Sequence, residues 1–301
     1  MMGERGPVLI AGRSGQVAHE LARVLRQTGR PFVALGRGDL DLADPSSIAR
    51  GISQHRPSLV INAAAYTGVD KAEDEPTVAR AVNATGAGLL AAAASRAGAP
   101  IVHISTDYVF DGTKPAPYLE TDATAPLGVY GATKLEGERL VAAANPRHVI
   151  VRTAWVFSPH GHNFVKTMLR LGTERDEIAV VADQSGAPTA AADLAEAIAH
   201  IASRLDCEQP NSERFGIFHA VNAGATTWHA FACAIMDGAK RRGAKAAHVR
   251  AISSAEYQTR ARRPANSALD TGKLLRVFDF ALPAWELALE RCLDNLIGSP
   301  R

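Results

Sequence analysis

The sequence has little cysteine, and its spacing does not suit a metal or redox motif. The three cysteines, Cys207, Cys233 and Cys292, lie far apart and form no C-x-x-C pair. Zinc ribbons and dithiol redox motifs need closely spaced cysteines. The sequence therefore argues against both classes of site and predicts reduced thiols, as in cytosolic proteins.

An excess of charge of one sign is also missing. The 33 Lys and Arg residues almost balance the 31 Asp and Glu residues, and the formal net charge is +2. A nucleic-acid-binding protein normally carries a basic face or stripe. The densest basic stretches, 240–242 and 260–263, are short. We therefore expect no nucleic acid among the partners of this protein.

Long hydrophobic runs are absent as well. The apolar run near the N-terminus covers only 8–11, and the longest apolar stretch is 89–94. Both are too short for a signal peptide or a membrane helix, which needs about 20 apolar residues. We expect no membrane association and a cytoplasmic location. The 47% of hydrophobic residues is nevertheless enough for a sizeable core.

Short apolar runs alternate with helix-like stretches in the first half of the chain. Continuous apolar runs indicate strands buried on both faces, here 8–11, 31–35, 59–61, 101–104 and 149–151. Helices are predicted between them, at 17–27, 46–55, 79–97 and 130–144. This alternation predicts an α/β fold with a Rossmann-type, doubly wound parallel sheet.

The alternation breaks after Arg152. Strands are predicted at 178–181 and 215–220, and helices at 191–205, 227–242 and 285–296. We expect a dinucleotide-binding domain over 1–155, with segments near 186–222 returning to it. We expect a smaller C-terminal substrate-binding lobe, made of 156–185 and 223–301, on the carboxyl edge of the sheet.

A glycine-containing turn follows the first predicted strand and opens the first helix. Gly12 and Gly15 stand in the sequence G-R-S-G-Q-V-A. Glycine allows a tight turn and a close backbone approach, and a helix N-terminus offers free N–H donors to a pyrophosphate. A purely structural turn is the alternative. Its position after the first strand favours a dinucleotide site.

Arg37 lies just after the second predicted strand. At this position an acidic residue binds the ribose hydroxyls of NAD, whereas arginine accommodates the 2′-phosphate of NADP. Arg37 therefore favours NADPH, with NADH as the other candidate and a solvated loop arginine as the structural alternative.

Tyr130 and Lys134 share one face of the predicted helix 130–144, since they are four residues apart. A free phenol has a pKa of about 10, and a nearby ammonium lowers it toward the working range. Tyr130 could then give a proton to a carbonyl while a nicotinamide gives hydride, and Lys134 could also hold the cofactor ribose. A surface pair is the default alternative.

The strand predicted at 101–104 runs into Ser105, Thr106 and Asp107. Ligands of open α/β sheets bind at the carboxyl ends of the strands. Thr106 could therefore bind a substrate carbonyl and Asp107 sugar hydroxyls, unless the group only caps a turn. Trp155 could stack on a sugar or base or pack in the core. Arg263 could clamp phosphate or stay exposed to solvent.

With these residues assembled, the chain resembles the extended short-chain dehydrogenases and, among them, the dTDP-4-dehydrorhamnose reductase family. The likeness extends over nearly the whole chain. Its motifs are 12–16, 62–67, 69–73, 105–110, 130–134, 152–156, 163–164, 183–184, Gly186, 188–189 and 263–267.

The resemblance implies reduction of dTDP-4-dehydro-L-rhamnose to dTDP-L-rhamnose by hydride transfer to C4. It implies that Tyr130 is the proton donor, Lys134 its partner and Thr106 a hydrogen-bonding group on the carbonyl side. The implied cofactor contacts are Gly15, Gln16 and Val17 at the pyrophosphate, Asp41 and Leu42 at the adenine, and Ala64, Ala65 and Tyr66 along the channel. The implied substrate contacts are Thr106, Asp107 and Trp155. A homodimer is a further expectation from the family.

Some family members hold a divalent metal between subunits through glutamates. Glu20 is present here, but 189–193 contains no glutamate, so a bound Mg²⁺ is not expected. His160 and His162 have no carboxylate beside them in the sequence and indicate a polar loop. We predict no metal.

Two other functions stay open at this point. A nucleotide-sugar epimerase or dehydratase would share the fold, the glycine turn and the Tyr/Lys pair. A catalytically silent nucleotide-binding subunit would share the fold, although the presence of Thr106, Tyr130 and Lys134 argues against it.

Overall fold

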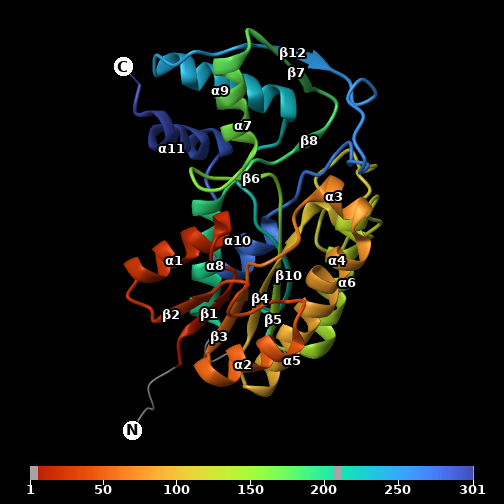
Figure 1. Ribbon diagram of the computed structural model, residues 1–301, viewed down its shortest axis with the longest axis vertical. Helices are drawn as coiled ribbons and strands as arrows, with labels where there is room; N and C mark the ends of the chain where they lie inside the picture. Colours follow the sequence, from red (N-terminus) through yellow and green to blue (C-terminus); the bar gives the residue numbers. More distant parts are fainter. Residues whose placement is uncertain (1–5, 206–211, 301) are drawn as a thin grey trace.

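The computed structural model describes residues 6–205 and 212–300, and a six-stranded parallel sheet forms its centre (Figure 1). The strand order is β10-β5-β4-β3-β1-β2, so the connection after β1 runs to one side, toward β2, and the connection after β3 runs to the other, toward β4. The strands are β1 (Val8–Ala11), β2 (Phe32–Leu35), β3 (Leu59–Asn62), β4 (Ile101–Thr106), β5 (His148–Thr153) and β10 (Gly216–His219). The predicted parallel α/β sheet is confirmed. Of the cysteines, Cys233 and Cys292 are free thiols, and Cys207 lies outside the described residues.

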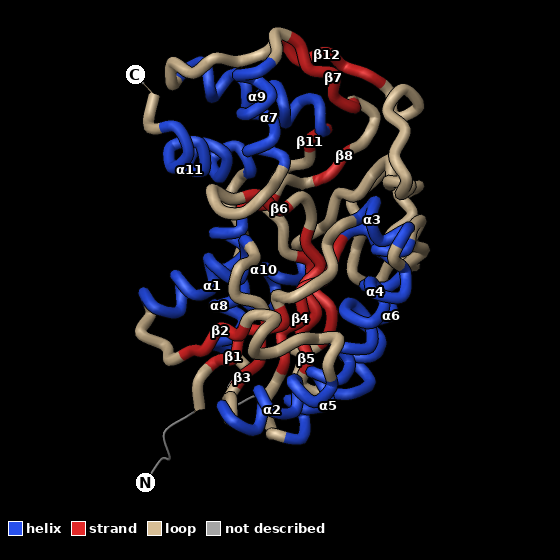
Figure 2. The backbone as a smooth tube through the Cα atoms, viewed as in Figure 1, coloured by secondary structure: helices blue, strands red, loops and turns tan. Residues whose placement is uncertain are grey.

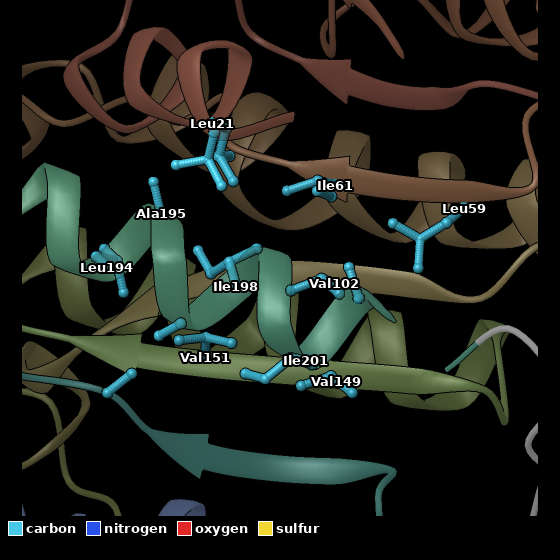
Figure 3. Close-up of a cluster of buried hydrophobic side chains, with 14 of the residues drawn as sticks. Leu21, Leu59, Ile61, Val102, Val149, Val151, Leu194, Ala195, Ile198 and Ile201 are labelled. Atoms are coloured by element: carbon cyan, nitrogen blue, oxygen red, sulfur yellow. The ribbon is translucent and has the colours of Figure 1, made fainter. Parts of the chain in front are cut away.

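Apolar side chains leave both faces of the sheet, which explains the continuous apolar runs. In β1, Val8 and Ile10 enter one hydrophobic core, whereas Leu9 and Ala11 enter the other. The first core is covered by α1 (Gln16–Gln27), α8 (Ala191–Arg204) and α10 (Gly272–Phe278). The second is covered by α2 (Pro45–His55), α5 (Ala87–Arg96) and α6 (Val129–Ala144). Figure 3 shows Leu21 of α1 and Ile198 of α8 over Ile61, Val102 and Val151 of the sheet.

The helix predicted over 79–97 is interrupted. It consists of α4 (Pro76–Arg80), the π-helical turn η1 (Ala81–Gly86) and α5. Neighbouring backbone lies very close to this turn: a Cβ on Gly137 of α6 would lie 2.0 Å from the Asn83 carbonyl oxygen. Hydrophobic periodicity does not reveal the extra residue of a π turn, so the sequence predicted a plain helix.

A second set of elements lies beyond the carboxyl edge of the sheet, and we call it the C-terminal lobe (Figure 2). It contains α7 (Phe164–Glu174), α9 (Trp228–Arg241), α11 (Trp285–Ile297) and the parallel pair β7 (Glu177–Val181) and β12 (His248–Ile252). Phe231 and Trp285 belong to its separate core. The sequence did not predict α7 or β12.

Several short elements lie outside the six-stranded sheet and the C-terminal lobe. They are β6 (Val156–Phe157), β8 (Ser185–Gly186), β9 (Thr189–Ala190), β11 (Thr226–Thr227), α3 (Val69–Asp74) and the 3-10 turn η2 (Asp107–Val109). β10 rejoins the sheet, and α10, which comes from the stretch 223–301, also packs on it. The division of the chain into domains stays a prediction. Among the described residues, no helix combines the length and apolar character needed to cross a membrane.

Candidate active site

A cleft of about 520 Å³ lies at the carboxyl ends of β1, β3, β4 and β5. The connections after the neighbouring strands β1 and β3 diverge at this edge, which is the usual ligand position in an open parallel sheet. Most of the predicted site residues line it, namely Gly15, Gln16, Val17, Ala64, Ala65, Thr106, Asp107, Tyr130, Lys134 and Trp155. The volume lies within the ordinary range for cofactor and small-molecule sites.

The turn after β1 has the geometry that a pyrophosphate needs. Gly12 has a φ of +105°, and a Cβ there would lie 3.3 Å from the backbone of Ala63. Gly15 precedes α1 and leaves the first turn of that helix without a side-chain cap. The N–H groups at the start of α1 are therefore available to an anion. These residues fit a dinucleotide.

A segment from the second half of the chain lies against this turn. Asn163 Nδ2 donates a hydrogen bond of 2.8 Å to Gln16 Oε1, and a Cβ on Gly161 would be 3.2 Å from the Gln16 side chain. Gly161 and His162 also line the cleft. Sequence reasoning did not find them, because it interpreted 160–162 only as a polar loop.

Arg13, from the turn after β1, lies over the loop after β2 that contains Arg37. Arg37 is exposed, and Arg13 reaches over Gly36 to pair with Asp39 at 3.3 Å. Two guanidinium groups and one carboxylate thus lie near the end of β2. Of the residues expected near the adenine, Asp41 accepts a hydrogen bond from the Ala43 N–H. Leu42 is buried in the core.

Tyr130, Lys134 and Thr106 come together in the cleft. Tyr130 lies in the first turn of α6, and it lines the cleft together with Thr106 at the end of β4. A Cβ on Gly131 would lie 2.1 Å from the Tyr108 carbonyl oxygen, so α6 packs directly on the backbone after β4. Asn83 ties the same helix to the loop after β3, because its Nδ2 donates to Thr133 Oγ1 and to the Tyr66 carbonyl oxygen.

The pKa of Tyr130 differs from the expectation. Burial raises the pKa of Tyr130 to about 12, whereas a lowered value was expected from the neighbouring ammonium. Lys134 points to β4, where its Nζ donates to the Ile104 carbonyl oxygen at 2.6 Å. Burial lowers the pKa of Lys134 to about 8. At neutral pH the phenol therefore keeps its proton, and most of the lysine is charged.

Asp107 is a buried carboxylate with free hydrogen-bonding capacity. Its Oδ1 accepts from Thr106 Oγ1 at 2.9 Å, and its Oδ2 has no hydrogen-bond partner among the described residues. Burial raises its pKa to about 6. A buried acceptor without a partner is costly, so a hydroxyl donor on a ligand would relieve this cost.

Two tryptophans from distant segments stack at the cleft. Trp155 follows β5 with a φ of +47°, and its ring lies 3.5 Å from that of Trp228 at an interplanar angle of 8°. A Cβ on Gly186 would lie 2.5 Å from the Trp155 ring, so only glycine fits there. Trp228 also lines the cleft. The sequence predicts only a helix at this position, so Trp228 was not among the predicted site residues.

Two predicted residues have other partners in this structure. Arg263 Nη2 pairs with Asp70 Oδ2 at 2.7 Å, and Asp70 belongs to α3. The Tyr66 hydroxyl donates to the Glu75 carboxylate at 2.8 Å. Their phosphate-binding and cofactor-binding roles stay predictions.

The residues considered for a metal also have protein partners. Glu20 is buried and accepts from Arg23 Nε at 2.6 Å, and His160 lies 3.6 Å from Glu20. Over 6–205 and 212–300, no group of three or more His, Cys, Asp or Glu side chains is arranged to hold a metal ion.

Comparison with known proteins places the chain in a family. The family model described as the RmlD substrate binding domain matches residues 6–297. The dTDP-4-dehydrorhamnose reductase of Sinorhizobium fredii is 47% identical over 291 residues, covering 96% of this chain and 97% of the relative. The reductase of Salmonella typhimurium is 45% identical over 295 residues, with 96% and 97% coverage.

Solved structures agree with the sequence relatives. A dTDP-4-dehydrorhamnose reductase from Clostridium acetobutylicum has a TM-score of 0.89 and 36% identity, covering 96% of this chain and 99% of its own. The reductase from Bacillus anthracis, solved in complex with NADP, has a TM-score of 0.89, 37% identity and the same coverage. The chain therefore belongs to the dTDP-4-dehydrorhamnose reductase family and is an oxidoreductase built on a Rossmann-type sheet.

Proposed function

We propose that this protein reduces dTDP-4-dehydro-L-rhamnose to dTDP-L-rhamnose with NADPH. The observation that carries the proposal is that Thr106, Tyr130 and Lys134 line one cleft together with the start of α1 at 14–17. The names of the relatives support the substrate, and the NADP complex of the Bacillus anthracis protein supports the cofactor.

The buried phenol is suited to act as an acid. When bound, the nicotinamide supplies hydride to the C4 carbonyl carbon of the sugar. Tyr130 holds its proton up to high pH and releases it to the carbonyl oxygen as negative charge develops there. Thr106 gives its hydrogen bond to Asp107 in the free protein, and it can redirect that bond to the substrate oxygen.

The remaining residues of the cleft bind and orient the sugar nucleotide. Oδ2 of Asp107 can accept a bond from a sugar hydroxyl, and the stacked Trp155 and Trp228 offer a flat apolar surface to a sugar or base. Arg263 lies beside the cleft on Asp70 and would have to exchange that carboxylate for phosphate. A homodimer and a cytoplasmic location remain predictions from the sequence.

We expect Arg37→Asp to shift the cofactor preference from NADPH toward NADH by about tenfold or more. A hydrogen bond to a charged group contributes about 1.5–3 kcal/mol, and the new carboxylate would also repel the 2′-phosphate. The ratio of kcat/KM for the two cofactors measures the shift. Arg276→Asp is the matched control, because Arg276 is an exposed arginine of α10. An unchanged ratio in Arg37→Asp would remove Arg37 from the ribose pocket.

The function is tested by following NADPH oxidation with a panel of dTDP- and UDP-linked 4-ketosugars. The proposal expects oxidation with dTDP-4-dehydro-L-rhamnose and formation of the 4-hydroxyl product. An epimerase would change the sugar without net consumption of NADPH, and a silent subunit would bind nucleotide without turnover. Either result would overturn the proposal.

A further inference from the structure

A fully buried histidine lies directly behind the lysine of the active site. His103, in β4, is 0% exposed, and both of its ring nitrogens have side-chain neighbours. Its Nδ1 is 3.0 Å from Asn62 Nδ2, and its Nε2 is 3.3 Å from Lys134 Nζ. Neither His103 nor Asn62 is among the residues that line the cleft.

The backbone of the cofactor loop determines which tautomer His103 adopts. The Ala64 N–H donates to Asn62 Oδ1 at 3.2 Å, so the amide must turn its NH₂ group toward the histidine. Nδ1 of His103 is then an acceptor, and the single proton of a neutral imidazole lies on Nε2. The ring is neutral because burial lowers the pKa of His103 well below its usual value.

The Nε2–H group of His103 therefore faces Lys134 Nζ. A neutral amine can accept that hydrogen bond, whereas an ammonium presents a donor to a donor. The other neighbours of Nζ favour the ammonium: the Ile104 carbonyl oxygen accepts from it, and the Glu138 carboxylate lies one turn further along α6. Two further groups adjoin these: Arg152 of β5 pairs with the Glu138 carboxylate and offsets its charge, and Tyr130 of α6 has a phenol that is neutral below a pH of about 12.

We propose that Asn62 and His103 act as a positioning pair: Asn62 orients the Nε2–H of His103 toward Nζ of Lys134, where it disfavours the charged form of the lysine. Lys134 lines the cleft, and its ammonium is the better hydrogen-bond donor to the cofactor ribose, so the pair thereby sets the upper pH limit of catalysis. It also connects that limit to the cofactor loop, since Asn62 binds the backbone of Ala64, which lines the cleft. This inference deepens the proposed function and rests on it.

The first test is the pH dependence of turnover. His103→Gln removes the Nε2–H, and Asn62→Asp keeps an acceptor for the Ala64 N–H but makes His103 donate from Nδ1 and accept at Nε2. Both variants should move the alkaline limb of kcat/KM, expected at a pH of about 8 in the wild type, upward by about one pH unit. A limb that stays in place in both variants would overturn the proposal.

The matched control is His219→Gln. His219 is also 0% exposed, but its Nδ1 contacts the Asp270 carbonyl oxygen at 3.1 Å, and its ring packs edge-on against Phe110. Its replacement should lower stability and leave the alkaline limb where it is. If this variant moves the limb as far as His103→Gln does, the shift reflects a general loosening of the fold, and the proposal is wrong.

The second test needs no turnover. Long-range ¹H–¹⁵N correlation spectra of the imidazoles, with His103 assigned by its loss in His103→Gln, report which nitrogen carries the proton. We expect Nε2–H in the wild type and Nδ1–H in Asn62→Asp, and an Nδ1–H signal in the wild type would overturn the inference. If the wild type fails to oxidise NADPH with the sugar, the proposed function fails, while these spectra still decide the tautomer.

Discussion

Tyr130→Phe should lower turnover by a factor of about 10² to 10⁴, the usual effect of losing a general acid. Phenylalanine keeps the ring that packs edge-on against Tyr108, at 5.9 Å between centroids, and removes only the hydroxyl that carries the proton. NADPH affinity, measured by fluorescence titration, should remain close to that of the wild type. Single-turnover rates of NADPH oxidation measure the loss.

Tyr118→Phe is the control for this experiment. Tyr118 is also buried, and its hydroxyl donates to Asp111 at 2.8 Å. Tyr118→Phe loses a phenol oxygen, as Tyr130→Phe does, but Tyr118 does not line the cleft. Near-normal turnover in Tyr118→Phe and in Tyr130→Phe alike would mean that another group gives the proton.

Arg152→Met should lower the free energy of unfolding by about 3–5 kcal/mol, because it leaves a buried carboxylate without its countercharge. Arg152 is 2% exposed, and its guanidinium makes two hydrogen bonds to Glu138, of 2.9 and 2.7 Å. The pair joins β5 to the helix that carries Tyr130 and Lys134. Urea denaturation at neutral pH measures the loss.

The comparison for Arg152→Met is an exposed pair of the same residue types. Arg170 pairs with Glu174 at 2.7 Å on the surface of α7. Arg170→Met should lower the free energy of unfolding by less than about 1 kcal/mol, since solvent screens that pair. Equal losses in the two variants would show that burial adds nothing to the Arg152–Glu138 pair.

The sequence predicted the sheet well because its signal is local. Each of the first five strands of the sheet contains a short apolar run, and in β1 the run is continuous because both faces are buried. The Tyr130–Lys134 pair could also be predicted from the sequence, because only one turn of helix separates the two residues. The turn 12–15 could be placed because it follows the first of these runs.

The features that the sequence did not predict depend on distant contacts. Trp228 meets Trp155, and Asn163 meets Gln16, only because the C-terminal lobe lies over the carboxyl edge of the sheet. The π turn at 81–86 likewise involves distant residues, because the backbone of other segments packs directly against it. The expected lowering of the Tyr130 pKa was wrong because spacing along a helix carries no information on burial.

The stacked indoles give this protein an intrinsic optical signal. It has three tryptophans, and the third, Trp285, is buried in the core of the C-terminal lobe. Two parallel chromophores at 3.5 Å couple their electronic transitions, so near-ultraviolet circular dichroism should be dominated by Trp155 and Trp228. A ligand that separates or tilts the two rings will therefore be detected without any label.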